Sequence, residues 1–297
     1  MATAALILVT AVWGFTFVQV KDAVELYPLF AFLAVRYLIA SAALAPVAVR
    51  RIRTLGREGL AAGAILGALI ALGIGLQTAG LERTTVTSAG FITGLYVLFT
   101  PLLALALFRT PIPRELWVAV GLALLGLALL SGVPEGSGVG DALVLVSTVA
   151  QALQIVMVER YANRFDAVAL TFVEVAGACV IFLLIAVARG DLSVPHGATV
   201  WAALLVTGLF AVAFAYLVQV WAQRQVSATR IAIIFSLETV FAGLAGYLFA
   251  GDRIGAVGFA GCAAIFAGIV LAEPAAAAVL RRMAGRPEPE PGLRSRG

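Results

Sequence analysis

The stretch ATRIAIIFSLETVFAGLAGYLFA, residues 228–250, decides the fold. As a helix it is roughly 34 Å long at 1.5 Å per residue, enough to cross a bilayer core about 30 Å thick. Glu238 lies near its middle, between the hydroxyl residues Ser236 and Thr239. A charge at that depth costs several kcal/mol unless it is paired, protonated or hydrated. We therefore expect Glu238 to face a polar cavity or a partner helix, the alternative being a protonated glutamate that only helps helices to pack.

The composition of the whole chain agrees with this interpretation. Of 297 residues, 62% are apolar and 12% are charged, whereas soluble domains are about half apolar and about a quarter charged. The sequence predicts an all-α integral membrane protein. Cys179 and Cys262 lie in separate apolar segments and His196 is the single histidine, so we expect no disulfide framework, metal site or cofactor. The basic residues lie almost wholly in short loops between apolar segments and form no basic stripe, which argues against a nucleic-acid partner.

Ten apolar segments follow one another along the chain, joined by short connections. They are residues 3–20, 28–49, 59–80, 86–108, 115–132, 140–158, 167–187, 199–221, 228–250 and 255–273. Fifteen Lys and Arg residues fall on the side of the N-terminus and four on the other side. By the positive-inside rule, both termini are predicted to be cytoplasmic.

An internal repeat sets the predicted architecture. When the first half is shifted along the chain by 138 positions, polar residues of the two halves coincide. The aligned positions are Trp13 with Gln151, Thr16 with Gln154, Arg36 with Glu174, and Thr100-Pro101 with Glu238-Thr239. Two halves of five helices each must cross the membrane in opposite directions, because five is odd, and such inverted repeats are typical of secondary transporters. The predicted organisation is a first five-helix repeat at 1–132, a linker at 133–139, a second five-helix repeat at 140–273 and a disordered cytoplasmic tail at 274–297.

The candidate site residues are polar side chains inside the first, fourth, sixth and ninth segments. They are Trp13, Thr16, Thr93, Tyr96, Thr100, Gln151, Gln154, Ser236, Glu238 and Thr239. Four polar helix faces near mid-membrane are what a solute cavity requires, although any single Thr or Gln can equally hold two helices together. Pro101 leaves the carbonyl of Val97 without its helical donor, which predicts a hinge or a substrate contact there.

Arg36 and Glu174 are charged residues at related depths in the second and seventh segments. We expect them to pair, directly or through water. A structural ion pair between the two halves and a gating pair that breaks during transport are both left open, as are two separate charges.

Four loose motifs occur in order across the ten segments. They are VWGFT at residues 12–16, Phe32-x-x-x-Arg36, FITGLY at 91–96 followed by Thr100-Pro101, and FSLE at 235–238. In this combination the chain resembles the EamA-type family of the drug/metabolite transporter superfamily over nearly its whole length. The resemblance implies a bacterial inner-membrane carrier that commonly exports amino acids or related metabolites, with roles for Trp13, Arg36 and Glu238. The family usually has Glu-Pro where Glu238-Thr239 stands, and a threonine bends a helix only weakly.

These observations predict a secondary transporter of a small amphipathic metabolite that works by alternating access through a midplane cavity, with outward transport expected. Glu238 would bind a substrate amine or carry a proton, protons being the candidate coupling ion. The solute is left open, as is a homodimer. A lipid-modifying membrane enzyme is the first alternative, but no enzyme motif is evident. A membrane scaffold is the second, although a scaffold gains little from duplicated inverted halves.

Overall fold

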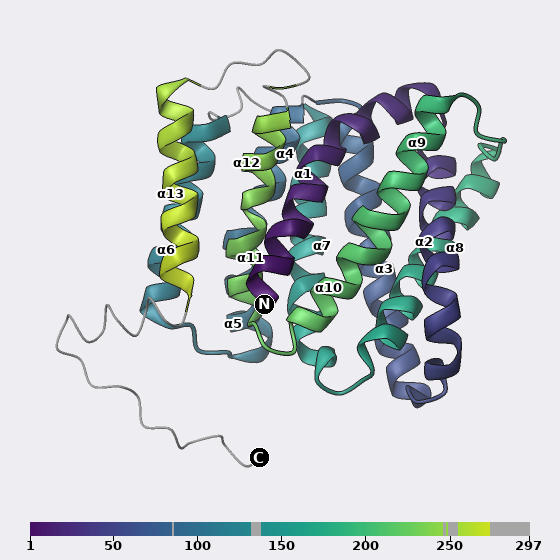
Figure 1. The fold of residues 1–297 in the computed structure, drawn as a ribbon, viewed down its shortest axis with the longest axis horizontal. Coiled ribbons are helices and arrows are strands. Elements are labelled where there is room, and N and C mark those ends of the chain that lie inside the picture. Colours follow the sequence, from purple (N-terminus) through teal and green to yellow (C-terminus); the bar gives the residue numbers. More distant parts are fainter. Residues whose placement is uncertain (85, 132–137, 246–247, 249–254, 274–297) are drawn as a thin grey trace.

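Helices are the only regular secondary structure in the residues that the computed structural model describes, which are 1–84, 86–131, 138–245, 248 and 255–273. They are α1 (Ala2–Leu26), α2 (Leu29–Ile52), α3 (Gly56–Leu81), α4 (Val86–Gly94), α5 (Tyr96–Phe108), α6 (Arg114–Ser131), α7 (Val139–Ala162), α8 (Ala167–Arg189), α9 (Ala198–Val206), the π-helix η1 (Thr207–Phe214), α10 (Ala215–Ala222), α11 (Ala228–Phe235), α12 (Leu237–Ala245) and α13 (Ala256–Ala272). Figure 1 shows them as one bundle, with α6 and α13 side by side at its edge.

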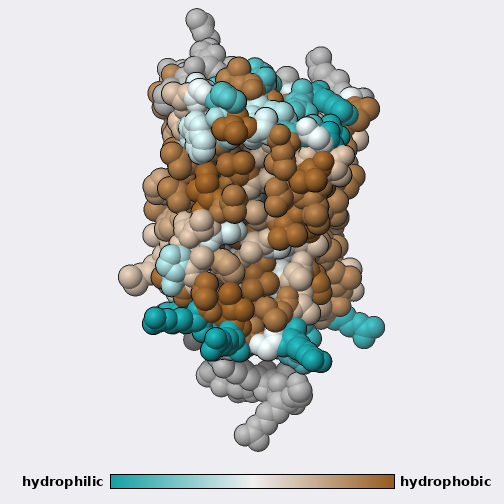
Figure 2. Space-filling view, turned by 90° about the vertical axis from the view of Figure 1, so that its right-hand side faces the viewer, coloured by the Kyte–Doolittle hydropathy of each residue, from teal (hydrophilic) through white to brown (hydrophobic). Residues whose placement is uncertain are grey.

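Eight helical runs within these described ranges are long and apolar enough to cross a membrane. Three of them combine consecutive elements: α4 with α5, α9 with η1 and α10, and α11 with α12. With α6 and the shorter apolar helix α13, the described part of the chain holds ten helical segments in the predicted order. On the face shown in Figure 2, a broad apolar band lies between hydrophilic residues near the two ends of the bundle. This is the architecture of a multi-pass membrane protein.

Two spans are interrupted near their middle. The first interruption lies at Leu95, between α4 and α5, and Pro101 lies six residues further on inside α5. The second lies at Ser236, between α11 and α12, where the hydroxyl donates to the carbonyl of Ile233 at 2.6 Å. The sequence led us to expect only a weak bend here. A serine that bonds back to its own helix competes with the backbone ladder, and the interruption here occurs without proline.

Small residues bring the helix backbones together around α3. A Cβ placed on Gly63 would lie 2.5 Å from Val173 of α8, and one on Gly80 would lie 2.7 Å from the carbonyl oxygen of Gly140 of α7. The helix α3 therefore fits closely between α7 and α8, because small residues let helix backbones approach each other. The predicted tail at 274–297, most of the predicted linker and the end of the ninth segment lie outside the described residues.

Candidate substrate-binding site

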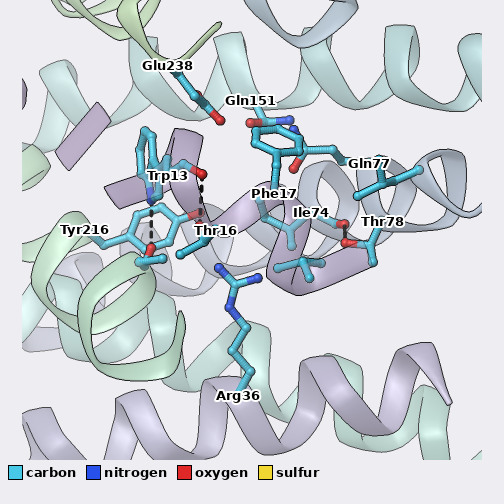
Figure 3. A pocket seen from close by; sticks show the side chains of 13 residues that line it. Trp13, Thr16, Phe17, Arg36, Ile74, Gln77, Thr78, Gln151, Tyr216 and Glu238 are labelled. Atoms are coloured by element: carbon cyan, nitrogen blue, oxygen red, sulfur yellow. Dashed lines mark hydrogen bonds between the residues drawn. The ribbon is translucent and has the colours of Figure 1, made fainter. Parts of the chain in front are cut away.

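A cavity lies at mid-depth in the bundle, between α1, α2, α3, α7, η1, α10 and α12 (Figure 3). The space within it that atoms do not fill is about 580 Å³, a volume that includes open solvent at its mouth. The lining residues are Trp13, Thr16, Phe17, Val20, Arg36, Ile74, Gln77, Thr78, Leu81, Gln151, Ala211, Tyr216 and Glu238. On α1 and α3 the lining residues run from mid-helix toward the C-terminal ends, so the cavity extends toward the end of the bundle where both helices finish.

Two residues of opposite charge reach into this cavity from opposite sides, as Figure 3 shows for Glu238 and Arg36. Glu238 is 8% exposed and its carboxylate accepts a hydrogen bond from the Tyr96 hydroxyl at 3.2 Å. Arg36 is 7% exposed, and its buried Nε has no hydrogen-bond partner within the described residues. Because the cavity separates the two side chains, both are available to a solute lying between them.

Trp13 lies beside the cavity within an aromatic cluster. Its indole N–H donates to the carbonyl of Ala211 in η1 at 2.8 Å. The ring packs against Phe235 at 4.8 Å between centroids and against Tyr216 at 6.2 Å. The hydrogen bond therefore fastens α1 to the π-helix, a type of distortion that often marks functional sites.

A second hollow lies beyond this aromatic cluster. Its lining residues are Trp13, Ile70, Tyr96, Gln151, Gln154, Ile155, Tyr216, Gln219 and Phe235. Both hollows are lined by Tyr216 of α10, but only the second is also lined by Gln219, one turn further along that helix. In the ninth span, Phe235 of α11 lines the second hollow and Glu238 of α12 lines the first cavity. Both changes lead toward the end of the bundle that holds the N-terminus (Figure 1). The cluster of Trp13, Tyr216 and Phe235 thus separates two hollows at different depths.

Glycines hold the backbones that carry the buried charges against neighbouring helices. A Cβ on Gly14 of α1 would lie 2.7 Å from the carbonyl oxygen of Glu238. A Cβ on Gly208 of η1 would lie 2.9 Å from the carbonyl oxygen of Arg36. Such distances leave no room for a side chain, so these contacts fix where both charged residues enter the bundle.

Comparison with known proteins identifies the relatives of this chain. A model of the EamA-like transporter family matches residues 1–132 and 138–272. The chain belongs to the EamA-like transporter family. It is 31% identical over 242 residues to an uncharacterized transporter of Archaeoglobus fulgidus, which covers 80% of this chain and 75% of that relative. The fold is also similar to that of a solved structure described as a crystal structure of a protein, with a TM-score of 0.76 and 16% sequence identity over 94% of this chain and 98% of that one. At this identity the similarity supports the fold alone.

These relatives confirm the family resemblance seen in the sequence and point to a membrane transporter of a small molecule, not to an enzyme. Four of the predicted site residues of this EamA-like transporter line the cavity together: Trp13, Thr16, Gln151 and Glu238. Tyr96 lies behind Glu238 as its hydrogen-bond donor and, like Gln154, lines the second hollow.

The other predicted site residues of the transporter lie outside the linings of both hollows. Thr93 accepts a hydrogen bond from the Gln77 amide at 2.9 Å, and Thr239 donates to the carbonyl of Gly90 at 3.3 Å. Ser236 bonds within its own helix, and the buried Thr100 hydroxyl has no partner in the described ranges. In this structure Thr93 and Thr239 therefore join helices or support a lining residue.

The direct ion pair expected between Arg36 and Glu174 is not formed in this structure. The ion pairs within 4 Å in the described part of the chain are Arg51–Asp166, Arg164–Glu58 and Arg189–Asp191. Arg36 points into the cavity instead, whereas Glu174 is fully buried and neither of its carboxylate oxygens has a hydrogen-bond partner within those ranges. Arg36 and Glu174 lie at similar depths in the bundle but do not pair, because the Arg36 side chain enters the cavity and the Glu174 side chain is enclosed by neighbouring helices.

The cavity also draws on spans that the sequence analysis did not assign to it. We expected walls from the first, fourth, sixth and ninth segments. The first, sixth and ninth line the cavity, and α2, α3, η1 and α10 contribute as well. The fourth does not line it and reaches only the second hollow, through Tyr96. Gln77 and Thr78 of α3 are the clearest omissions. They are adjacent polar residues near the end of an otherwise apolar segment, and that signal could have identified them.

Proposed function

We propose that this EamA-like protein is a secondary transporter that exports an amino acid or a related zwitterionic metabolite by alternating access. The observation that carries the proposal is the placement of Glu238 and Arg36 on opposite sides of one cavity. An α-amino acid carries an ammonium and a carboxylate group. Glu238 suits the ammonium, and the planar Arg36 guanidinium suits the carboxylate, which it can bind through two parallel hydrogen bonds.

The remaining walls fit the rest of such a solute. Phe17 and Ile74 offer apolar contact for a substrate side chain, and Thr16, Gln77 and Gln151 offer hydrogen-bonding groups. Apolar wall residues combined with a few convergent polar groups are usual in a small-molecule site. The specificity within the amino-acid class would then depend on the apolar part of the wall.

We further propose that the chain is an inverted repeat of two five-helix halves, at 1–132 and 140–273. Corresponding helices of the two halves pack against each other, α2 with α8 and α6 with α13. Gly67 of the third span lies against the carbonyl of Glu174, as Gly208 of the eighth span lies against that of Arg36. In transporters with such repeats the substrate binds near the midplane where the halves meet, and access alternates as one half rocks against the other.

The proposed orientation has both termini in the cytoplasm, because the basic loops lie on the side of the N-terminus. The resemblance to EamA-type carriers suggests the inner membrane of a bacterial cell. The larger cavity then lies on the external side of the Trp13 cluster and the second hollow on the cytoplasmic side. A proton gradient is the proposed energy source for export.

Flux in reconstituted liposomes tests this proposal. The full chain would be assayed with a mixture of tritiated L-amino acids, and both Glu238→Gln and Trp13→Ala are expected to lose most of the exchange shown by the unmodified protein. Ser147→Ala is the matched control, since this fully buried hydroxyl donates only to the carbonyl of Val144 in its own helix. If both site variants transport every amino acid as well as Ser147→Ala does, the site assignment is wrong.

A further inference from the structure

Glu174 is a buried acid that the proposed binding of a zwitterion by Arg36 and Glu238 leaves without a role. Its side chain is fully buried in the middle of the bundle. Neither carboxylate oxygen has a hydrogen-bond partner among the described residues, and no described cation lies within 4 Å. An ionisable residue inside a membrane bundle is costly to keep and therefore points to function.

The groups around Glu174 come from four helices. Tyr37 of α2 and Tyr216 of α10 are close enough to interact electrostatically with it, and both also interact with Arg36. The amide of Gln154 on α7 lies alongside, without a completed hydrogen bond. The helix α3 approaches Glu174 through the backbone of Gly67. A Cβ on Gly67 would lie 2.6 Å from the backbone carbonyl oxygen of Glu174.

A line of buried amides leads from Glu174 toward the N-terminal end of the bundle. Gln219 donates to the Gln154 side-chain oxygen at 2.9 Å and also to Gln223 at 3.1 Å, and Gln223 in turn donates to the carbonyl of Ile155 at 2.7 Å. Gln154 and Gln219 also line the second hollow. Glu174 therefore has a polar route on that side, within an otherwise apolar interior.

The surroundings favour a neutral carboxylic acid in the conformation described. An isolated carboxylate removed from water costs far more than its protonated form, and here no hydrogen bond or cation compensates. Ionisation would require water or Arg36 to reach the side chain. Both would follow from a rocking motion that opens the second hollow toward Gln154, since alternating access exchanges which side of the site is open.

We propose that Glu174 is the site that carries the coupling proton, separate from the substrate carboxylate Glu238. This inference rests on the proposed function and names its coupling site. A carboxylate oxygen of Glu174 takes a proton from external water while the external side is accessible, and Glu174 is then occluded as a neutral acid. The bond breaks when the cytoplasmic side opens, and the proton passes to water there while the outgoing zwitterion loads between Arg36 and Glu238.

Two readouts on the full chain in liposomes separate coupling from binding, with an equimolar mixture of tritiated L-amino acids as the probe. Exchange at equal pH requires no net proton movement, whereas accumulation against a gradient does. A pH difference of one unit can drive up to about tenfold accumulation by one-for-one exchange. Glu174→Gln, which stays neutral, is expected to keep exchange within about twofold of the unmodified protein but to lose pH-driven accumulation. Glu238→Gln is expected to lose both.

Thr171→Val is the matched control on the same helix, one turn before Glu174. Its fully buried hydroxyl donates to the carbonyl of Ala167 within α8, so both readouts should be retained. If Glu174→Gln retained pH-driven accumulation, the proposal would be overturned. Loss of exchange together with accumulation, in protein that remains monodisperse, would also overturn it, because Glu174 would then serve binding or folding.

Carbodiimide labelling decides the role of Glu174 even if no amino acid is transported, an outcome that would refute the proposed function alone. Dicyclohexylcarbodiimide partitions into membranes and reacts with protonated carboxyl groups. Peptide mass spectrometry is expected to find an adduct on Glu174 whose yield falls as the pH is raised. An unlabelled Glu174, or a yield independent of pH, would contradict a proton-carrying role.

Discussion

Arg36 and Glu174 occupy matching positions in the molecule and meet different surroundings. Each stands seven residues after the first residue of its helix, α2 or α8. Each has its carbonyl oxygen in contact with a glycine of a neighbouring span, Gly208 or Gly67. Yet the Arg36 guanidinium reaches into the cavity, whereas the Glu174 carboxylate is enclosed.

The main difference between the two positions is the winding of the helix that faces them. Arg36 lies against η1, a π-helix, whereas Glu174 lies against the regular α-helix α3. A π-helix has more residues per turn, and within η1 the carbonyl of Ala211 accepts the Trp13 indole beside the cavity. One backbone arrangement can therefore hold either a side chain that reaches a cavity or one that is enclosed, depending on the local winding of the opposing span.

Replacement of Arg36 by leucine should have the largest effect on transport. If Arg36 binds the substrate carboxylate, loss of a buried charged contact of about 2–5 kcal/mol lowers amino-acid exchange by roughly 30-fold or more. The same change removes a buried guanidinium whose Nε lacks a partner, so thermal stability in detergent should stay level or rise. Arg36→Lys should retain part of the activity, since lysine keeps the charge without the planar fork. Normal exchange by the leucine variant would mean that Arg36 and Glu174 are equally remote from substrate.

Alanine at each of the two glycines tests whether the matched contacts are equally tight. A Cβ would come within 2.6 Å of the Glu174 carbonyl at Gly67 and within 2.9 Å of the Arg36 carbonyl at Gly208. Overpacking of this kind typically costs 1–3 kcal/mol, so both variants should unfold at lower temperature, Gly67→Ala the more strongly. Gly121→Ala is the control, because a Cβ there meets nothing within 4 Å. Equal stability of Gly208→Ala and Gly121→Ala would remove the correspondence between the halves.

Much of this arrangement was predictable from the sequence, because a bilayer restricts the chain strongly. Apolar length predicted the ten helical segments, and the cost of a buried charge singled out Glu238. Trp13 and Gln151 were found because polar residues repeat at related positions in the two halves. These inferences needed only depth and spacing.

The rest depends on directions that spacing does not encode. The sequence does not show that the Arg36 side chain turns into a cavity, or that Thr239 turns toward the carbonyl of Gly90. Nor does apolar patterning reveal the π-helix η1, since each of its residues would fit an ordinary helix equally well. The interruption at Ser236 lacks the proline that would have marked it. Helix type and side-chain direction are decided by tertiary packing, which no single segment determines.

Replacement of Trp13 by phenylalanine should have a moderate effect, because it removes one hydrogen bond and keeps an aromatic ring. The bond from the indole to the carbonyl of Ala211 joins α1 to η1, the helix that distinguishes the two halves. A hydrogen bond of this kind contributes about 1 kcal/mol, so exchange should fall about fivefold. Initial rates of exchange at equal pH measure the change. An effect as large as that of Trp13→Ala would assign the function to the indole N–H rather than to ring packing against Phe235.

Substitution of Thr239 by valine should have the smallest effect, and it tests whether the two interrupted spans, α4 with α5 and α11 with α12, differ in function. Thr239 aligns with Pro101 in the repeat, and its hydroxyl donates to the carbonyl of Gly90 at 3.3 Å, joining α12 to α4. Valine keeps the shape and loses the bond, so stability should fall by about 1 kcal/mol or less and exchange should change less than twofold for every amino acid. Thr100→Val is the matched control, since it removes a buried hydroxyl that has no partner in the described ranges and should not lower stability. A change in amino-acid preference with Thr239→Val would make Thr239 a binding residue and would place substrate between α4 and α12, closer to Glu238 than to Arg36.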